Sequence, residues 1–390
     1  MNVVPHHTRG TTYFSGGGGT VTVRDVQEIM EGWAPPDIAW ERDNVGLQVG
    51  DPAARVRGIL VALDATEAIV EEASRRRANL IISHHPLLFR PLRSVTTEDR
   101  NARCVMALVR KRIALYAAHT NLDFTKRGTS FALAESLGLL KQRFLRTPYR
   151  LQSKIVTFVP SSHVEAVARA MSEAGSGVIG AYDRCSFRIA GTGTFRGGEG
   201  SRPARGGAGR LERVPEVRLE MVLPRRASQS VVRAMKNAHP YEEPAYDLYQ
   251  LENVTGDYGM GVIGELPRPV TLRTFIGTVR RRLGVRAPKF TGNLRSMVRS
   301  VAVCGGSGGE LLPEAIGAGA DVFVTADVKY HAFHDAAGRI ALVDGGHFET
   351  EYPVVRAIVE RLRHELRARK RPPVVAAAAQ STNPVRHGLT

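Results

Sequence analysis

Short apolar runs alternate with amphipathic segments along much of this chain, and that alternation restricts the fold more than any other feature of the sequence. Residues 55–66, RVRGILVALDAT, predict a strand, residues 67–78 predict a helix with one apolar face, and residues 79–83, NLIIS, predict another strand. Residues 102–112 and 113–123 repeat the order of helix and strand. Strands and helices that alternate in this way form α/β layers, whose ligand sites lie at the carboxyl ends of the strands.

Residues 150–255 follow a different order. The predicted elements there are strand, helix, strand, strand, helix and strand, which is typical of a ferredoxin-like α+β unit. Because the α/β alternation resumes afterwards, we predict an interrupted α/β core of two lobes, 21–149 and 256–390, with the ferredoxin-like segment as an insert. Residues 1–20, which end in SGGGGT, are expected to form a disordered extension.

The composition argues against several classes of protein. The 390 residues contain only Cys104, Cys185 and Cys304, so a disulfide framework is not expected and a metal would be bound through nitrogen and oxygen. No apolar run approaches the ~20 residues that span a bilayer. The first residues also lack the apolar region of a secretory signal. We therefore expect a cytoplasmic protein without a membrane partner.

The formal net charge of +16 favours anionic partners such as nucleotides, because a positive field raises the local concentration of anions. The densest basic run, at residues 361–371, is interpreted as a solvated helix face, because no nucleic-acid-binding motif accompanies it. A nucleic-acid partner therefore has no support from motifs. The glycine-rich segment 305–309 lacks the Gly-Lys-Ser/Thr of a phosphate-binding loop, so we interpret it as a tight turn.

Two adjacent histidines, His84 and His85, directly follow the predicted strand at 79–83 and precede Pro86. A lone histidine at a strand end is usually a hydrogen-bonded packing residue. The side chains of a vicinal pair diverge, however, so each imidazole can serve a separate metal ion of a two-metal site. Pro86 holds the preceding backbone extended and stiffens the turn. The pair therefore predicts part of a dinuclear metal site.

A second segment, HTNLD, also follows a predicted strand and ends in Asp123, which offers a hard oxygen ligand. We expect His119 and Asn121 to orient the Asp123 carboxylate by hydrogen bonds. The alternative is that Asp123 only caps the next helix.

A third segment, DGGHFETE, lies between a predicted strand and a long predicted helix. His347 and Glu351 are four residues apart, so they share one helical face and can converge on one centre, whereas Glu349 points elsewhere. Two divalent ions beside two carboxylates keep a positive charge that suits water or an anionic substrate. We expect the ions to lie about 3.5 to 4 Å apart. Nitrogen and oxygen ligands fit Zn, Fe, Mn or Ni and do not choose among them.

Several of these segments resemble a known family. The stretches DNVGLQVGD, ISHHPLLF, AAHTNLD, GDYGMGVIGEL, ADVKYH and DGGHFETE resemble the signature segments of the GTP cyclohydrolase I type 2 family, also called Nif-three-like dinuclear metal centre proteins. The insert, which contains AHPYEEPAYDLY, resembles the PII-like domain of longer family members. The resemblance covers residues 21–385 and implies a toroidal homohexamer whose metal sites face an internal cavity. It also implies two divalent metal ions per subunit, bound by His84, His85, Asp123, His347 and Glu351.

The resemblance leads to two hypotheses of function. The first is a metal-dependent hydrolase that acts on a nucleotide, such as GTP, or on another phosphate-containing small molecule. In that reaction Glu351 would bridge the ions, and His331 or His119 would carry a proton. Lys329 would contact a phosphate, unless its segment only ends a strand and orients ligands. The alternative is a non-enzymatic hexameric protein with a metal-dependent binding or regulatory role, because a shared fold does not fix the activity.

The arginine-rich loop at 196–213 adds an expectation about access to the cavity. We expect Arg202, Arg205 and Arg210 to give the openings of the hexamer a positive potential that attracts anions.

Overall fold

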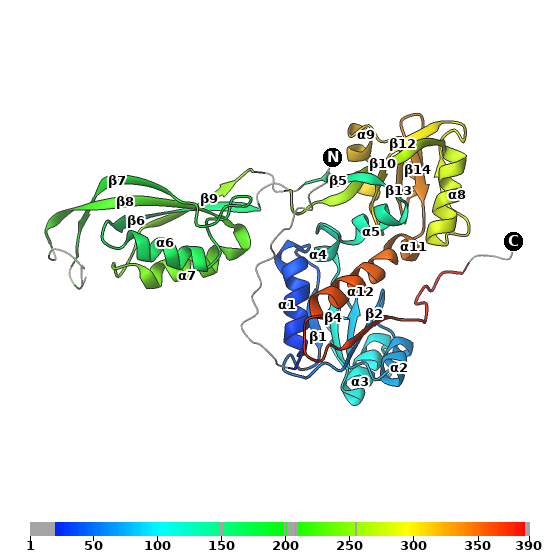
Figure 1. Ribbon diagram of the computed structural model, residues 1–390, viewed down its shortest axis with the longest axis horizontal. Coiled ribbons are helices and arrows are strands. Elements are labelled where there is room, and N and C mark those ends of the chain that lie inside the picture. Colours follow the sequence, from blue (N-terminus) through cyan, green and yellow to red (C-terminus); the bar gives the residue numbers. More distant parts are fainter. Residues whose placement is uncertain are drawn as a thin grey trace. The chain divides into compact units, whose positions relative to one another are not determined.

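The computed structural model describes residues 20–147, 151–198, 200, 207, 209–253 and 256–386 (Figure 1). The chain divides into two compact units. We call Met1–Arg146 together with Asp257–Thr390 the core unit, and Thr147–Gly256 the second unit. The predicted N-terminal extension lies outside the described residues, apart from residue 20.

The first sheet of the core unit has five strands in the order β1-β4-β3-β2-β15. Three of them read GILVA, LIIS and ALYA and are buried along their whole length, as expected of parallel strands that are covered on both faces. Their neighbour β15 is also parallel, while β1 runs antiparallel to β4. The bounds are β1 (Gly46–Val49), β2 (Gly58–Ala62), β3 (Leu80–Ser83), β4 (Ala114–Ala117) and β15 (Val374–Ala377).

Helices cover both faces of this sheet. Ile59 and Val61 of β2 pack with helices α1 (Val23–Trp33) and α12 (Pro353–Leu366), while Leu60 packs with α2 (Glu67–Arg75) and α3 (Arg100–Lys111). This alternation follows from the two-residue period of a strand. At the start of α1, Thr22 and Asp25 form a capping box, in which each side chain bonds to the backbone N–H of the other residue.

The second sheet of the core unit has six strands in the order β11-β14-β13-β12-β10-β5. Its three parallel strands are β12 (Met297–Val303), β13 (Val322–Thr325) and β14 (Ala341–Asp344), and its antiparallel strands are β5 (Leu140–Arg146), β10 (Met260–Thr271) and β11 (Lys289–Thr291). One face packs against α5 (Thr129–Ser136) and α8 (Leu272–Leu283), the other against α9 (Leu312–Gly317) and α10 (Tyr330–Ala336).

The boundary between the two lobes differs from the prediction. Helix α5 and strand β5 belong to the segment predicted as the first lobe, yet they pack in the second sheet and its core. Conversely, α12 and β15 belong to the segment predicted as the second lobe but complete the first sheet and its core. The apolar pattern of a segment does not report which sheet that segment joins. From here on, the first lobe means the five-stranded sheet with its helices, and the second lobe the six-stranded sheet with its helices.

The second unit contains the six elements in the order that the sequence predicts. They are β6 (Gln152–Pro160), α6 (Val164–Glu173), β7 (Phe187–Arg196), β8 (Leu211–Pro224), α7 (Ser228–Ala238) and β9 (Tyr246–Leu251). The strands form an antiparallel sheet in the order β7-β8-β6-β9, and both helices pack on it around a core that includes Ile155, Leu219 and Met235. Of the three loop arginines, Arg202 and Arg205 lie outside the described residues, and Arg210 is exposed.

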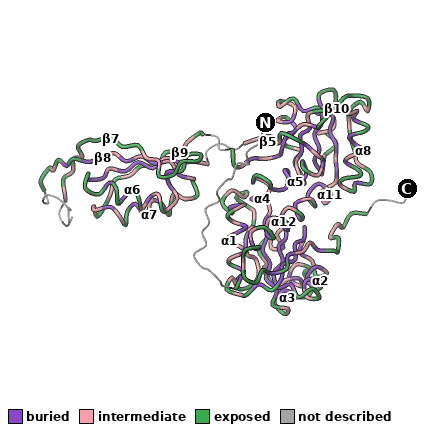
Figure 2. Tube along the Cα trace, in the orientation of Figure 1, coloured by how far each residue is buried: buried purple, intermediate pink, exposed green. Residues whose placement is uncertain are grey.

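The protein is thus a mixed α/β protein with three sheets in its described residues. Buried positions follow the central strands of the core unit, whereas β7 and β9 of the second unit are largely exposed (Figure 2). Within the described part of the chain, no helix has the length and apolar character needed to cross a membrane.

Candidate metal centre

His84 and His85 leave the carboxyl end of β3. Their backbone N–H groups continue the pairing with β2, because His84 N donates to Ala62 O (3.2 Å) and His85 N donates to Leu63 O, just after β2 (2.9 Å). The Ser83 hydroxyl donates to the carbonyl of His85 (2.8 Å). The extended backbone that presents both imidazoles is therefore held by hydrogen bonds on either side.

The second segment forms a single helical turn, α4 (Thr120–Asp123), directly after β4. Asn121 does not serve Asp123 in the expected way. Its Nδ2 donates to Ala34 O (2.7 Å), and its Oδ1 accepts from the backbone N–H of His119 (2.9 Å). Asn121 thus fixes the turn that carries His119, because its amide can bond to two backbone groups at once.

The third segment begins a short helix, α11 (His347–Glu351), after β14 and a Gly345–Gly346 turn with a positive φ of 78° at Gly346. His347 Nε2 lies 3.2 Å from Glu351 Oε2, so the two side chains share one helical face as the spacing predicts.

The five side chains singled out in the sequence meet at one point between the lobes. Glu351 lies in the middle: its Oε2 is 2.9 Å from His85 Nε2 and 3.2 Å from His347 Nε2. Its Oε1 is 3.8 Å from His84 Nε2. Asp123 Oδ1 lies 3.5 Å from the same His84 nitrogen. The two oxygens of Glu351 therefore face two different groups of side chains.

Each imidazole in the cluster is anchored through Nδ1. The acceptors are the carbonyl of Ala118 for His84 (2.8 Å), and the carboxylates of Asp64 for His85 (2.8 Å), Asp43 for His119 (2.9 Å) and Asp327 for His347 (2.6 Å). Carbonyls and carboxylates only accept hydrogen bonds, so Nδ1 carries the proton. The lone pair of each neutral ring is then on Nε2, which is the arrangement found in metal-binding histidines.

When the imidazoles are neutral, three buried atoms of the cluster lack a hydrogen-bond partner among the described residues: His84 Nε2, Asp123 Oδ1 and Glu351 Oε2. An unpaired buried polar atom costs about 1 to 3 kcal/mol, so native proteins retain few of them. In each of two groups of side chains, the possible ligand atoms lie within 4.8 Å of one another. One group contains His84, His85 and His119, and the other contains His85, His347 and Glu351. Divalent cations would satisfy these unpaired atoms, so the residues fit a metal site.

Comparison with known proteins identifies the family. The model of the family described as Duf34/NIF3 (NGG1p interacting factor 3) matches residues 21–384. The chain belongs to the NIF3 family.

Its relatives include proteins named GTP cyclohydrolase 1 type 2 homolog. The one from Halalkalibacterium halodurans is 39% identical over 92% of this chain and 97% of the relative, and the one from Mycobacterium tuberculosis is 40% identical over 88% and 92%. Among solved structures, a Bacillus cereus protein related to NIF3 is 39% identical with a TM-score of 0.77, over 95% of this chain and 100% of the other. A Staphylococcus aureus protein is 30% identical with a TM-score of 0.77, over 94% and 99%.

Three aspartates in this NIF3-family protein hold the imidazoles but were not assigned a role from the sequence: Asp43, Asp64 and Asp327. Each has a signal in the sequence that could have found it. Asp64 and Asp327 end apolar runs, ILVALD and VFVTAD, at the same sheet edges as the ligands, and Asp43 begins the motif DNVGLQVGD. The distances to the histidines, however, come only from the fold.

The electrostatics of the cluster favour positive charge. Although burial opposes protonation of His85, the carboxylates of Asp64 and Glu351 raise its pKa to about 10. Glu351 likewise raises the pKa of His347 to about 9, against the effect of burial. Burial would raise the pKa of Glu351, but three imidazoles hold it well below its usual value. Burial raises the pKa of Asp123, so this carboxyl needs nearby positive charge to ionise.

The two predicted proton carriers lie in different surroundings. The His119 ring is within the cluster, with its centroid 5.3 Å from that of His84 and 5.5 Å from that of His85. His331 is exposed and its ring packs beside Tyr330 at 5.7 Å. Lys329 is also exposed. The described contacts connect His119 to the cluster, and the roles of His331 and Lys329 stay predictions.

The glycine-rich turn at 305–309 lies against the cluster. Gly306 has a positive φ of 66°, and a Cβ added there would overlap Glu351 Oε1. Its N–H donates to the hydroxyl of Thr350 (3.1 Å), which holds the turn against α11. Gly306 therefore meets two requirements at once, a left-handed backbone and a close approach to the central carboxylate.

Proposed function

We propose that this protein is a metal-dependent hydrolase with two divalent ions per subunit, acting on a nucleotide or another phosphate-containing small molecule. The observation that carries the proposal is the position of Glu351, whose two oxygens face two groups of imidazole and carboxylate ligands. The printed name of the relatives, GTP cyclohydrolase 1 type 2 homolog, supports a nucleotide as the substrate class. The donor set leaves Zn, Fe, Mn and Ni as candidate metals.

In the proposed centre, His84 and Asp123 would hold one ion, His85 and His347 would hold the other, and Glu351 would contribute one oxygen to each. The three unpaired buried atoms support this division, because one lies on His84, one on Asp123 and one on the bridging carboxylate.

Two bound divalent ions would lower the pKa of water and polarise a substrate oxygen. We assign the proton transfer to His119. The Nε2 atoms of the other three imidazoles lie within 3.8 Å of Glu351, whereas the carboxylate contact of His119 is with Asp43 through Nδ1. Asp43 bonds to Nδ1 and orients the ring, so Nε2 is free to accept a proton from water and pass it to a leaving group.

The experiment compares turnover by metal-loaded and chelator-treated protein, with GTP and a panel of other phosphate compounds. We expect turnover that is lost on chelation and in His84→Ala and Glu351→Ala. His364→Ala is the matched control, because His364 is an exposed histidine of α12. Protein that binds two ions but turns over none of these compounds would favour the non-enzymatic binding role instead.

We further propose that residues 150–255 form a separable ferredoxin-like, PII-like domain. The order of its elements and the strand order β7-β8-β6-β9 support this, together with a core of its own. Deletion of the segment should leave metal binding intact. A folded deletion protein that no longer binds metal would show that the insert contributes ligands.

The family resemblance also supports a toroidal homohexamer. Sedimentation at micromolar concentration tests it: the hexamer predicts a mass six times that of the chain, and a monomer would refute the assembly.

A further inference from the structure

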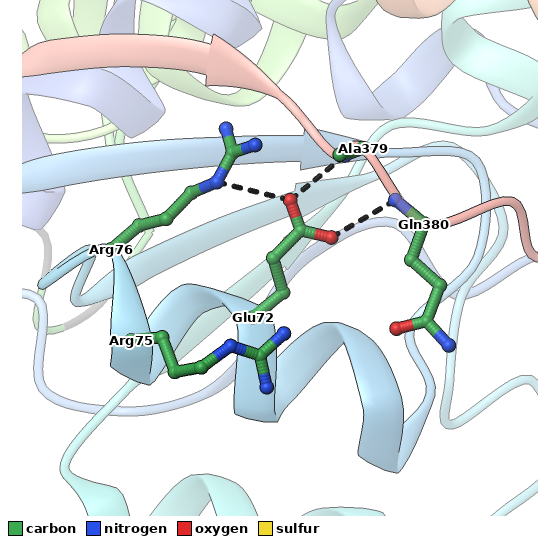
Figure 3. A pocket seen from close by; sticks show the side chains of 5 residues that line it. All are labelled: Glu72, Arg75, Arg76, Ala379 and Gln380. Atoms are coloured by element: carbon green, nitrogen blue, oxygen red, sulfur yellow. Dashed lines mark hydrogen bonds and ion pairs between the residues drawn. The ribbon is translucent and has the colours of Figure 1, made fainter.

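The C-terminal segment after β15, residues 379–386, bonds to both lobes close to the proposed metal centre, and we call it the C-terminal strap. Its first contact is with Glu72, a buried carboxylate on α2 (Figure 3). One oxygen of Glu72 accepts from Ala379 N (2.8 Å) and the other from Gln380 N (3.1 Å). Arg76 Nε lies 3.1 Å from the first of these oxygens. A charged carboxylate that bonds two successive N–H groups holds the start of the strap firmly.

The next contact reaches a partner of a proposed ligand. The hydroxyl of Thr382 donates to Asp64 Oδ2, while Asp64 Oδ1 bonds to His85 Nδ1 at 2.8 Å. The two oxygens of Asp64 are thus divided between the strap and the imidazole. Because Thr382 restrains one oxygen, the other keeps its direction toward His85.

A third contact lies on the second lobe. Asn383 Nδ2 donates to Glu349 Oε1 (3.0 Å), and Asn383 Oδ1 accepts from Val385 N (3.0 Å). Glu349 stands on α11 between His347 and Glu351. The strap therefore connects Asp64, which bonds to His85, with the helix α11, which carries His347 and Glu351.

We infer that the C-terminal strap positions the metal centre, with Thr382 as a positioning residue that acts on His85 through Asp64. Asn383 acts in the same way on α11 through Glu349. The inference rests on the proposed metal centre and not on its catalysis. It explains why a segment with little regular structure makes three anchors within five residues, one through the backbone at Ala379–Gln380 and two through the side chains of Thr382 and Asn383.

The test measures Co²⁺ binding to the full chain by chelator competition, together with the visible absorption spectrum of the bound Co²⁺. Loss of a direct partner of a ligand histidine weakens metal binding about 10- to 100-fold, so we expect this of Asp64→Asn. Thr382→Val keeps the shape of the side chain but removes the hydroxyl, which is one hydrogen bond further from the metal than Asp64 is. It should weaken Co²⁺ binding roughly threefold and shift the absorption spectrum. Thr382→Ser should restore both properties.

A double mutant separates positioning from general stability. If Thr382 acts through Asp64, Thr382→Val should have no further effect on Co²⁺ affinity in the Asp64→Asn background. Gln380→Ala is the matched control within the strap, because the contact with Glu72 uses only the backbone of Gln380, and it should behave as the wild type.

The outcomes distinguish the strap from the metal centre itself. Wild-type protein that binds no Co²⁺ would refute the proposed centre. Wild-type binding with an unchanged affinity and spectrum in Thr382→Val would refute the role of the strap alone. Additive effects in the double mutant would refute the route through Asp64.

Discussion

The two ends of the proposed metal centre lie in very different surroundings. His84, on the first lobe, is fully buried, and its Nδ1 bonds to a backbone carbonyl. The side chain of His347, on the second lobe, is 39% exposed, and its Nδ1 bonds to Asp327, whose side chain is 54% exposed. A backbone carbonyl in a sheet-bound segment cannot rotate away or change its charge, whereas an exposed carboxylate can do both.

This difference has a consequence for metal binding. The half that contains His84 and Asp123 is preorganised, so it should bind its ion more tightly and release it more slowly. The half that contains His85 and His347 is more open to solvent and should exchange its ion more easily. Glu351 belongs to both halves, because it faces His84 with one oxygen and His85 and His347 with the other.

The largest effect is expected from Glu351→Gln, which should weaken the binding of both ions and so abolish the difference between the halves. A neutral amide cannot compensate two cations, so metal affinity should fall by more than about 100-fold, beyond the loss of an outer partner. Metal content after dialysis measures the effect, with His364→Ala as the control. A variant that retains both ions would show that Glu351 is not the bridging ligand.

Single histidine variants should sharpen the comparison. His84→Ala and His347→Ala should each leave about one ion, but only His84→Ala should also destabilise the metal-free protein. It removes a fully buried side chain and the hydrogen bond from its Nδ1 to the carbonyl of Ala118, which costs about 1 to 3 kcal/mol, whereas His347→Ala at the surface should stay within about 0.5 kcal/mol. Urea denaturation measures both. Equal destabilisation would contradict the unequal burial of the two halves.

Gly306→Ala should disturb the carboxylate that the halves share without removing a ligand. The added methyl would overlap Glu351 Oε1, and alanine is strained at this positive φ. We expect the affinity for metal to fall about tenfold, in the range of outer-partner variants. Gly309→Ala is the control, because a Cβ there meets no described atom within 4 Å. Equal affinities in the two variants would refute the packing argument.

The smallest effect is expected from Asp327→Asn. The amide oxygen still accepts from His347 Nδ1 but loses the charge, and solvent already screens this exposed pair. The affinity for the more weakly bound ion should fall by about 10-fold at most, which is the lower end of the range for outer partners. The affinity for the other ion should not change. Calorimetric titration separates the two ions. An equal loss at both sites would contradict the division into halves.

The sequence predicts the local parts of this molecule well because their signals are local. Apolar runs identify β2, β3 and β4, and the ligand types stand directly after strands. These local signals could not predict that α5 and β5 join the second lobe, or that α12 and β15 join the first. Which sheet a strand joins depends on pairing across hundreds of residues, and its own pattern does not report it.

The candidate site shows the same limit. His84, His85 and Glu351 could be chosen by residue type and spacing, but the contact between Asp64 and Thr382 could not. They are 318 positions apart and meet only when the strap crosses the first lobe. Asn121 was assigned to Asp123 by proximity in sequence, whereas its amide instead bonds to the backbone around His119. Hydrogen-bond partners depend on direction, which spacing does not give.

The most direct test of the metal centre is anomalous diffraction from crystals of the metal-loaded protein. We predict two peaks, one beside His84 and Asp123 and one beside His85 and His347, about 3.5 to 4 Å apart on either side of the Glu351 carboxylate. No peak at this position, or a structure in which His84 and His85 pack away from Asp123, would contradict it.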